Sequence, residues 1–341
     1  MRLTQTGCQA ARIYRGDEIE AIHCASVAVV NGEGKLTHYL GDPEFVTMMR
    51  SAIKPFQLMP LILSGAADHY RFSPRQLAIM AGSHSGTDEH IEVVRQNLAA
   101  ADNEPGLLQC GAHWPLGMQA AGEYPLRGED RDSLRHNCSG KHSGFLALAR
   151  YMKRPVEEYL KPEVKPQQVV KHMVSDFTEF PMERMPTGVD GCSAPNFPLA
   201  LFNVALAFMK LATGHGLDGS LAEATERIRS AMLKHPVMVS GHGRFDLALS
   251  QALPGRLVCK IGAEAVEGIG LTDPPTGIAV KIHDGGERAL GPVVVEVLRQ
   301  LSILPGPENI SLIRRYVRPE VCNARDTVTG HIVPDFKLLK V

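Results

Sequence analysis

The stretch RSAIKP, residues 50–55, places a serine three positions ahead of a lysine. Side chains three residues apart are neighbours on a helical surface, so Ser51 and Lys54 would share one face. A serine hydroxyl becomes a useful nucleophile when a neighbouring group takes its proton, and a neutral lysine amine can do so. Roughly one chance Ser-x-x-Lys is expected in a chain of this length, so an N-cap serine beside a solvated lysine is the alternative.

The residues around this pair predict its local backbone. Pro55 disfavours the α conformation at Lys54, so we expect a helix start or a short 3₁₀ turn over residues 51–54, with the main helix after it. The missing N–H of a proline costs little in the first turn of a helix. A serine at a helix start also gains backbone N–H donors, which could form half of an oxyanion hole.

Two other segments offer a second hydroxyl and a second amine. In AGSHSG, residues 81–86, small residues would leave Ser83 at the end of an element, either as a helix cap or as a catalytic hydroxyl. Lys260 lies in the apolar run VCKIGAEA, although lysines in strands normally alternate outward. It is either an edge-strand lysine that discourages aggregation or a lysine in a cleft, where Gly262 lets a ligand approach the backbone.

Two cysteines lie in dense clusters of glycine and polar residues. They are Cys138 in RHNCSGKHSG and Cys192 in TGVDGCSAP. With a nearby histidine they could bind zinc, although the spacing is not that of a finger or ribbon. Cys138 and His142 could instead form a thiol nucleophile pair. The third alternative is two buried free thiols without a chemical role.

Composition excludes several classes of function. The chain has 341 residues, of which 44% are hydrophobic and 21% charged, which is ordinary for a globular protein. A formal net charge of −1 gives no electrostatic footprint for nucleic acid or an anionic membrane. Residues 1–20 lack the apolar region of a secretory signal, and the seven cysteines are scattered. We therefore expect free thiols and a cytoplasmic protein.

The pattern of apolar and turn residues predicts an α+β fold over a single domain, residues 1–341. Strands are expected near both ends of the chain, in one sheet, with a helical lobe inserted at roughly 55–240. Asn31–Gly34 would close a hairpin. Residues 197–209 are too few to span a bilayer and read as a buried helix. The other expectations are helices at 55–65, 87–102, 142–153, 164–178, 220–234 and 287–304, loops over 100–140, and two paired strands at 255–265 and 277–285.

Taken together, the motifs RSAIKPFQ, AGSHSG, HNCSGKHSG, GVDGCSAPNF and KIGAE resemble those of the asparaginase II family, the Rhizobium-etli-type or class 3 L-asparaginases. The resemblance runs in order over roughly residues 25–335. It implies a fold similar to serine β-lactamases and penicillin-binding proteins, with a mainly antiparallel sheet flanked by helices. The second and third motifs here read Ser-His-Ser and Lys-Ile-Gly, which departs from the β-lactamase pattern, so β-lactam turnover is not expected.

The resemblance implies a hydrolase that converts L-asparagine to L-aspartate and ammonia, working as a homodimer. Ser51 would be the nucleophile with Lys54 as its base, and Ser83 with Lys260 would form the second hydroxyl–amine pair. The family also implies a zinc ion held by two cysteines and a lysine near the substrate, without a role in activating water. By motif match these ligands are Cys138, Lys141 and Cys192.

A small zwitterionic substrate needs opposite charges at fixed positions. Asp190 is the candidate partner of the α-ammonium group, and Arg50 that of a carboxylate or of a structural contact. One extra methylene would displace the amide of glutamine from Ser51, so a sharp preference for asparagine is expected. The alternatives are a zinc-assisted amidohydrolase, a small-molecule binding module on the same scaffold with catalysis lost, and a cytosolic β-lactamase or peptidase.

Overall fold

The computed structural model describes residues 8–116 and 131–341. The chain divides into two compact units. We call residues 1–47, 199–213 and 251–341 the sheet unit, and residues 48–198 and 214–250 the helical unit. Part of the predicted 100–140 loop region, residues 117–130, lies outside the described residues, as does the beginning of the N-terminal segment. The single domain over residues 1–341 stays a prediction.

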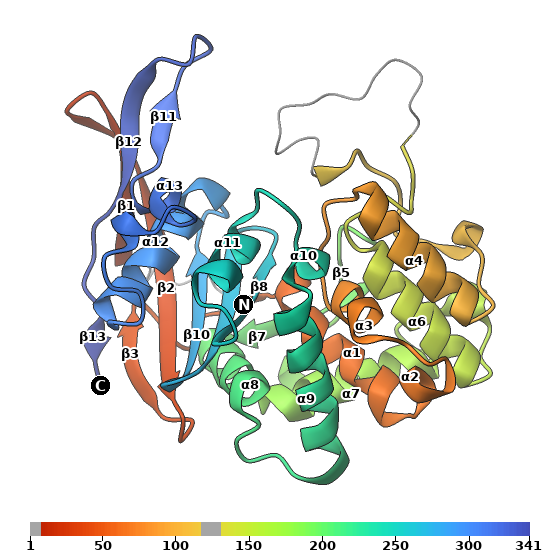
Figure 1. Cartoon of the computed structure of the whole chain (residues 1–341). Helices are drawn as coiled ribbons and strands as arrows, with labels where there is room; N and C mark the ends of the chain where they lie inside the picture. The colour runs from red at the N-terminus through yellow and green to blue at the C-terminus, as the bar shows by residue number, and fades with distance from the viewer. Residues whose placement is uncertain (1–7, 117–130) are drawn as a thin grey trace. The chain divides into compact units, whose positions relative to one another are not determined.

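The sheet unit is built on a 9-stranded sheet to which both ends of the chain contribute (Figure 1). Every strand pair in this sheet is antiparallel, which confirms the predicted α+β class with a mainly antiparallel sheet. The main path runs β11-β12-β1-β2-β10-β9-β8, and β3 pairs with β2 and β13. The strands are β1 (Cys8–Arg15), β2 (Glu18–Asn31), β3 (Leu36–Leu40), β8 (Leu257–Gly262), β9 (Val266–Thr272), β10 (Pro275–Ile282), β11 (Glu320–Cys322), β12 (Val328–Pro334) and β13 (Leu339–Lys340).

The hairpin predicted around Asn31–Gly34 is confirmed, because β2 pairs with β3 across that turn. The predicted pairing of 255–265 with 277–285 is wrong, since β9 lies between β8 and β10. Glu264 and Ala265 both adopt left-handed backbone angles, with φ of 64° and 55°, and so close a tight hairpin turn from β8 into β9. The sequence hid β9, because glycines in a strand weaken the strand pattern.

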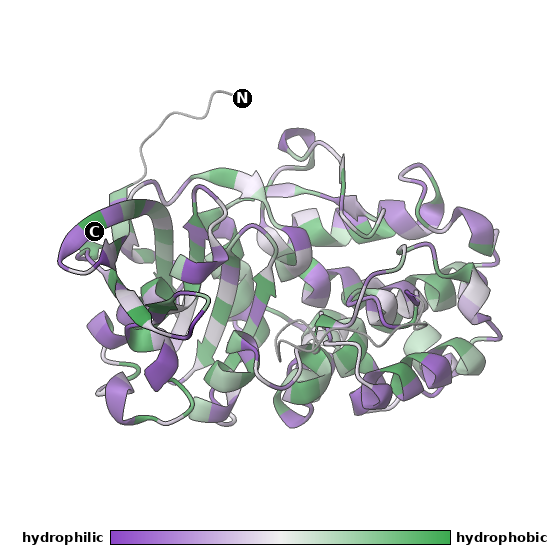
Figure 2. Cartoon of the chain, turned by 90° about the horizontal axis from the view of Figure 1, so that it is seen from above, coloured by the Kyte–Doolittle hydropathy of each residue, from purple (hydrophilic) through white to green (hydrophobic). Residues whose placement is uncertain are grey.

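Glycines on one face of the sheet let a helix approach closely. The helix is α8 (Leu201–Thr213), which confirms the buried helix expected at 197–209 except that it begins after a short strand. A β-carbon at Gly277 would lie 1.9 Å from the backbone oxygen of Ala205, and one at Gly268 would lie 2.0 Å from the ring of Phe208. Hydrophobic residues follow the strands of this unit in Figure 2 (green). A larger side chain at these glycines would therefore separate the helix from the sheet.

We expect Gly277→Ala to lower the free energy of unfolding by about 3 kcal/mol. The new methyl group would clash with the backbone of α8, which cannot move away as a flexible side chain could. Thermal unfolding followed by circular dichroism measures the loss. Gly106→Ala is the matched control, since a β-carbon there meets nothing within 4 Å. Equal midpoints for the two variants would contradict the close approach of α8.

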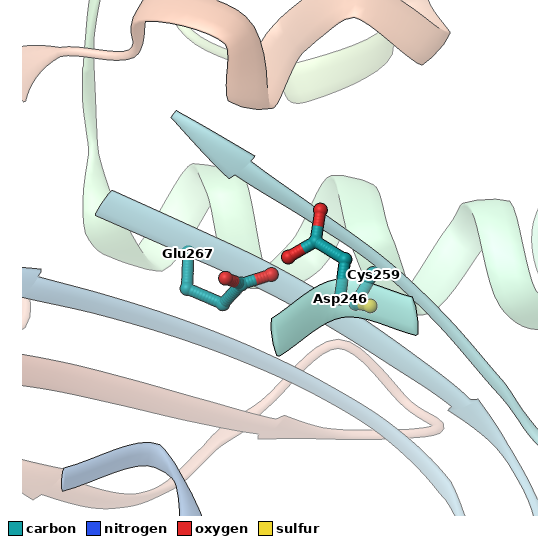
Figure 3. Close-up of side chains that lie close together, drawn as sticks. All are labelled: Asp246, Cys259 and Glu267. Atoms are coloured by element: carbon teal, nitrogen blue, oxygen red, sulfur yellow. The ribbon is translucent and has the colours of Figure 1, made fainter. Parts of the chain in front are cut away.

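The sheet unit also contains the helix α12 (Glu287–Gln300) and several short elements. The predicted helix at 287–304 is present as α12, which contacts β1, β10 and β12. Figure 3 shows Cys259 on β8 and Glu267 on β9. The register pairs Ile261 with Glu267, so Cys259 and Glu267 share one face of the sheet. The remaining elements are η5 (Pro307–Asn309) and α13 (Arg314–Val317), and β4 (Val46–Met48) and β7 (Pro198–Ala200) lie where the chain passes between the units.

The helical unit contains the predicted helices at 55–65, 87–102, 142–153, 164–178 and 220–234 with small shifts at their ends. In the part of the chain that the structure describes, no helix is long and apolar enough to cross a membrane. The helices are α1 (Lys54–Leu63), α2 (Ala66–His69), α3 (Pro74–Met80), α4 (Asp88–Ala100), α6 (Ser139–Tyr151), α7 (Lys165–Thr178), α9 (Gly219–Lys234), α10 (Pro236–Val239) and α11 (Phe245–Ala252). Short elements are η1 (Arg50–Ile53), η2 (Pro105–Leu107), η3 (Val156–Glu158), η4 (Met182–Arg184), β5 (Gly188–Val189) and β6 (Pro195–Asn196).

Candidate active site

Ser51 lies on the 3₁₀ turn η1, and α1 begins at Lys54 with Pro55 in its first turn. This confirms the predicted 3₁₀ start followed by the main helix. Side chains at i and i+3 eclipse in a 3₁₀ turn, so Ser51 and Lys54 lie on the same side of it. Ser51 remains 9% exposed whereas Lys54 is fully buried. Among the described residues the backbone N–H of Ser51 donates no hydrogen bond, as expected for the first turn of a helix.

The Lys54 amine is bonded to the Ser83 loop. Lys54 Nζ donates hydrogen bonds to Ser83 Oγ at 2.7 Å and to the Gly82 oxygen at 2.8 Å, and it lies 3.2 Å from Cys138 Sγ. No hydrogen bond joins the Ser51 hydroxyl to Lys54 within residues 8–116 and 131–341. The serine hydroxyl that contacts the predicted base is therefore that of Ser83. Ser51 lies one 3₁₀ turn ahead of Lys54 in the chain and makes no hydrogen bond to its amine among the described residues.

The Ser83 loop is held by the end of α10 and by Arg244, which follows that helix. A β-carbon at Gly82 would lie 2.6 Å from the Met238 oxygen, so only glycine lets the two backbones meet there. The Ser83 N–H donates to the Val239 oxygen at 2.8 Å. The guanidinium group of Arg244 donates to the Ser83 oxygen. Ser83 is thus fixed on both sides of its peptide unit, and its hydroxyl is directed at Lys54.

His84 joins the Ser83 loop to the loop that carries Cys138. The Gly86 N–H donates to His84 Nδ1 at 3.2 Å, so the proton of the neutral ring is on Nε2, which lies 2.9 Å from Ser139 Oγ. Burial, assisted by the neighbouring His90 and Lys54, lowers the pKa of His84 well below its ordinary value. His84 is therefore a neutral structural bridge rather than a proton carrier.

The environment of Lys54 favours its neutral form. Burial lowers the pKa of Lys54, and the positive charge of Lys141 lowers it further against the opposing effect of Cys138. A buried amine with a lowered pKa can accept a proton near neutral pH.

Cys138, Lys141 and Cys192 converge in the interior of the helical unit. Lys141 Nζ donates to Cys192 Sγ at 3.1 Å. The hydrogen bond between the two thiols lowers the pKa of Cys138 well below its usual range and raises the pKa of Cys192. Burial opposes the charge of Lys141, but the neighbouring Cys192 and Cys138 thiols raise its pKa overall. The three side chains thus form one buried cluster whose groups influence one another's pKa values.

This donor set fits a zinc ion, because two thiolates and one amine nitrogen are soft and borderline ligands that Zn²⁺ accepts. All three side chains are buried, and both cysteines are free thiols. The alternative of a Cys138–His142 thiol nucleophile is not supported. His142 Nδ1 lies 2.6 Å from the Tyr159 hydroxyl, and no hydrogen bond links it to Cys138 among the described residues.

Arg50 and Asp190, the predicted substrate-binding pair, bind each other. Arg50 Nε donates to Asp190 Oδ1 at 2.6 Å, and the Asp190 side chain is 6% exposed. The Gly191 N–H also donates to Asp190 Oδ1, and Asn196 Nδ2 donates to Asp190 Oδ2 at 3.2 Å. This geometry gives Asp190 a clear role in holding Arg50. Its contact with a substrate ammonium group stays a prediction.

Lys260 belongs to the sheet unit, on β8. It is fully buried, and its Nζ donates to the Ile261 oxygen at 2.6 Å. Full burial argues against a solvated edge lysine that only discourages aggregation. The predicted partnership of Lys260 with Ser83 is not tested by these contacts and stays a prediction.

Comparison with known proteins identifies the family. A sequence model described as L-asparaginase II matches residues 11–334. The chain belongs to the L-asparaginase II family. Among solved structures, it is similar to one described as "putative beta-lactamase from Bacteroides dorei DSM 17855", with a TM-score of 0.36, 11% sequence identity, and coverage of 85% of this chain and 93% of that one. A search of curated proteins finds no match.

Membership of this family makes the protein an asparaginase-type amidohydrolase, as the sequence motifs had suggested. Three residues of the site were missed by sequence reasoning: His84, Asn196 and Arg244. His84 and Asn196 stand inside quoted motifs, but their roles depend on partners distant in sequence. Arg244 stands in SGHGRF, where only the neighbouring glycines signal a special backbone.

Proposed function

We propose that the protein hydrolyses the side-chain amide of L-asparagine to L-aspartate and ammonia, with Ser51 as nucleophile. The observation that carries this proposal is the buried Lys54 amine, one 3₁₀ turn from Ser51 and 2.7 Å from Ser83 Oγ. A buried amine that contacts one serine hydroxyl and follows a second serine by one 3₁₀ turn, in a chain of an amidohydrolase family, suits nucleophilic attack on an amide carbonyl.

In the proposed reaction neutral Lys54 accepts the Ser51 proton as Ser51 Oγ attacks the amide carbon. The Ser51 N–H, which lacks a partner among the described residues, would donate to the developing oxyanion. Lys54 then returns the proton through the Ser83 hydroxyl to the leaving ammonia, and the ester at Ser51 is hydrolysed by water. Lys260 is proposed to assist Ser83, as the family resemblance implies.

The zinc ion implied by the family would be held by Cys138, Lys141 and Cys192. When bound, it would supply a positive charge and a Lewis acid close to Lys54, whose amine lies 3.2 Å from Cys138 Sγ. That proximity favours a zinc-assisted amidohydrolase as the second candidate. Ser51 and Lys54 remain the groups to which we assign attack and proton transfer.

Ammonia release from L-asparagine and from L-glutamine tests the proposed function directly. We expect turnover of asparagine, with kcat/KM about 100-fold lower for glutamine, because the longer side chain moves the amide away from Ser51 Oγ. D-asparagine and buffer alone are the controls. Equal efficiency for the two amides would contradict the specificity, and absence of turnover would favour the binding-module alternative.

Zinc analysis separates the two candidates. We expect the purified protein to contain about one zinc ion per chain and Cys192→Ser to lose most of it, as measured by elemental mass spectrometry. Cys24→Ser, which changes a free thiol on β2 of the sheet unit, is the matched control and should keep the metal. If serine chemistry dominates, the metal-free protein retains measurable turnover. Complete and reversible loss of turnover on metal removal would favour the zinc-assisted reaction.

A further inference from the structure

The residue ahead of the proposed nucleophile has an unusual backbone. Arg50 adopts φ of +51°, in the left-handed region that side chains with a β-carbon rarely enter. Such conformations persist where surrounding contacts impose them, and they are frequent at functional sites. Arg50 is directly followed by Ser51, so whatever imposes this conformation also sets the direction in which the nucleophile is presented.

The side chain of Asn196 holds the backbone of Arg50 from both sides. The Arg50 N–H donates to Asn196 Oδ1 at 3.0 Å, and Asn196 Nδ2 donates to the Arg50 oxygen at 3.1 Å. Asn196 is only 1% exposed, so water does not compete for these bonds. One amide group thus satisfies the donor and the acceptor of a single residue 146 positions away in sequence.

A third bond fixes Asn196 itself. Its Nδ2 also donates to Asp190 Oδ2 at 3.2 Å, and Asp190 Oδ1 accepts from the Arg50 side chain. A β-carbon on Gly191 would lie 3.3 Å from the Arg50 guanidinium, so that side chain lies close against the 190–191 backbone. Arg50 is therefore held through its backbone by Asn196 on β6 and through its side chain by Asp190, in the turn between β5 and β6.

The bond to the Arg50 oxygen has a specific consequence for Ser51. The carbonyl of Arg50 and the N–H of Ser51 belong to the same planar trans peptide, so they point in opposite directions. Fixing the oxygen fixes the direction of the N–H. That N–H is the one we assign to the oxyanion, and it has no other partner among the described residues.

We propose that Asn196 is a positioning residue: by binding both backbone groups of Arg50 it locks the Arg50–Ser51 peptide plane and aims the Ser51 N–H at the oxyanion. The inference rests on the proposed role of Ser51. Its effect is on the transition state more than on substrate binding, because the oxyanion forms only during the reaction.

Two substitutions of Asn196 test this role. Asn196→Asp keeps an acceptor for the Arg50 N–H but loses the donor to the Arg50 oxygen, and Asn196→Ala loses both. We expect kcat for asparagine to fall about 100-fold in each, as for removal of one oxyanion donor, with KM changed less than about threefold. Asn196→Ser serves if either variant does not fold.

The matched control is Asn97→Ala on α4, a fully buried asparagine of the same unit whose Nδ2 donates to Ser143 Oγ. Its loss of a buried amide should lower the unfolding midpoint comparably while kcat stays near the wild-type value. If Asn97→Ala and the Asn196 variants lose kcat equally, Asn196 acts through general stability and the proposal is overturned. Wild-type kcat in folded Asn196 variants overturns it as well.

A second readout separates this inference from the proposed substrate. A neutral fluorophosphonate probe should label Ser51 in the wild type, located by peptide mass spectrometry, and label it about 100-fold more slowly in the Asn196 variants. If the wild type releases no ammonia but shows this labelling pattern, the asparaginase proposal fails and the positioning role stands. If Ser51 of the wild type is not labelled, or if the rates are equal, the positioning role fails.

Discussion

Replacement of Ser51 by alanine is expected to lower kcat for asparagine by about 10⁴-fold or more, because it removes the atom that forms the acyl-enzyme. The structural effect should be small. The Ser51 hydroxyl makes no hydrogen bond among the described residues, so its loss leaves no buried partner unsatisfied. We expect the free energy of unfolding to change by less than about 1 kcal/mol. Ammonia release and thermal unfolding, measured on the same preparation, check both statements.

The closest rival to Ser51 is Ser83, whose hydroxyl is the one bonded to Lys54. If Ser83 only relays a proton, Ser83→Ala should cost about 100-fold in kcat, much less than Ser51→Ala. Ser64→Ala is the matched control and should keep full turnover, because within the described part of the chain this half-buried hydroxyl bonds only the Leu61 oxygen and the Ala66 N–H. The assignment is reversed if Ser83→Ala abolishes turnover while Ser51→Ala retains it.

The sequence predicted those parts of the fold that depend on local patterns. Asn31–Gly34 signals a hairpin through turn residues alone, and the short 3₁₀ start ahead of the main helix is present at Arg50–Ile53, although Lys54 itself adopts the α conformation that Pro55 was expected to disfavour. The sequence did not predict β9, because the glycines of that strand interrupt its apolar pattern. Those glycines are needed for the close approach of α8. In a sequence, a glycine that permits close packing cannot be told from a glycine that forms a turn. Only the element packed against it distinguishes the two.

The site shows the same limit. The motifs predicted which residue types belong to the site, whereas the hydrogen-bond partners of the Lys54 amine cannot be read from i, i+3 spacing, which is the only geometry that a sequence provides. That amine contacts Ser83 and Cys138, which lie 29 and 84 residues further along the chain. Likewise, Asp190 was assigned to a substrate charge since its pairing with Arg50, 140 positions away, cannot be read from either motif.

Replacement of Lys54 by methionine is expected to separate activity from stability. Methionine has a similar volume and no amine, so the proposed base is lost while the packing around residue 54 is largely kept. We expect kcat to fall about 10³-fold, since general-base catalysis by a positioned side chain contributes roughly 10²- to 10⁴-fold. The unfolding midpoint should change little, because removing the desolvated amine offsets the hydrogen bonds lost to Gly82 and Ser83.

Lys281→Met is the matched control for Lys54→Met. Lys281 is another buried lysine, on β10 of the sheet unit, and its amine donates to the Glu264 oxygen. If buried lysines act here only through packing, the two variants should lose stability and turnover in parallel. If Lys54 is the base, only Lys54→Met loses turnover, and fluorophosphonate labelling of Ser51 slows in that variant alone. Wild-type labelling of Ser51 in folded Lys54→Met would exclude Lys54 as the group that takes the serine proton.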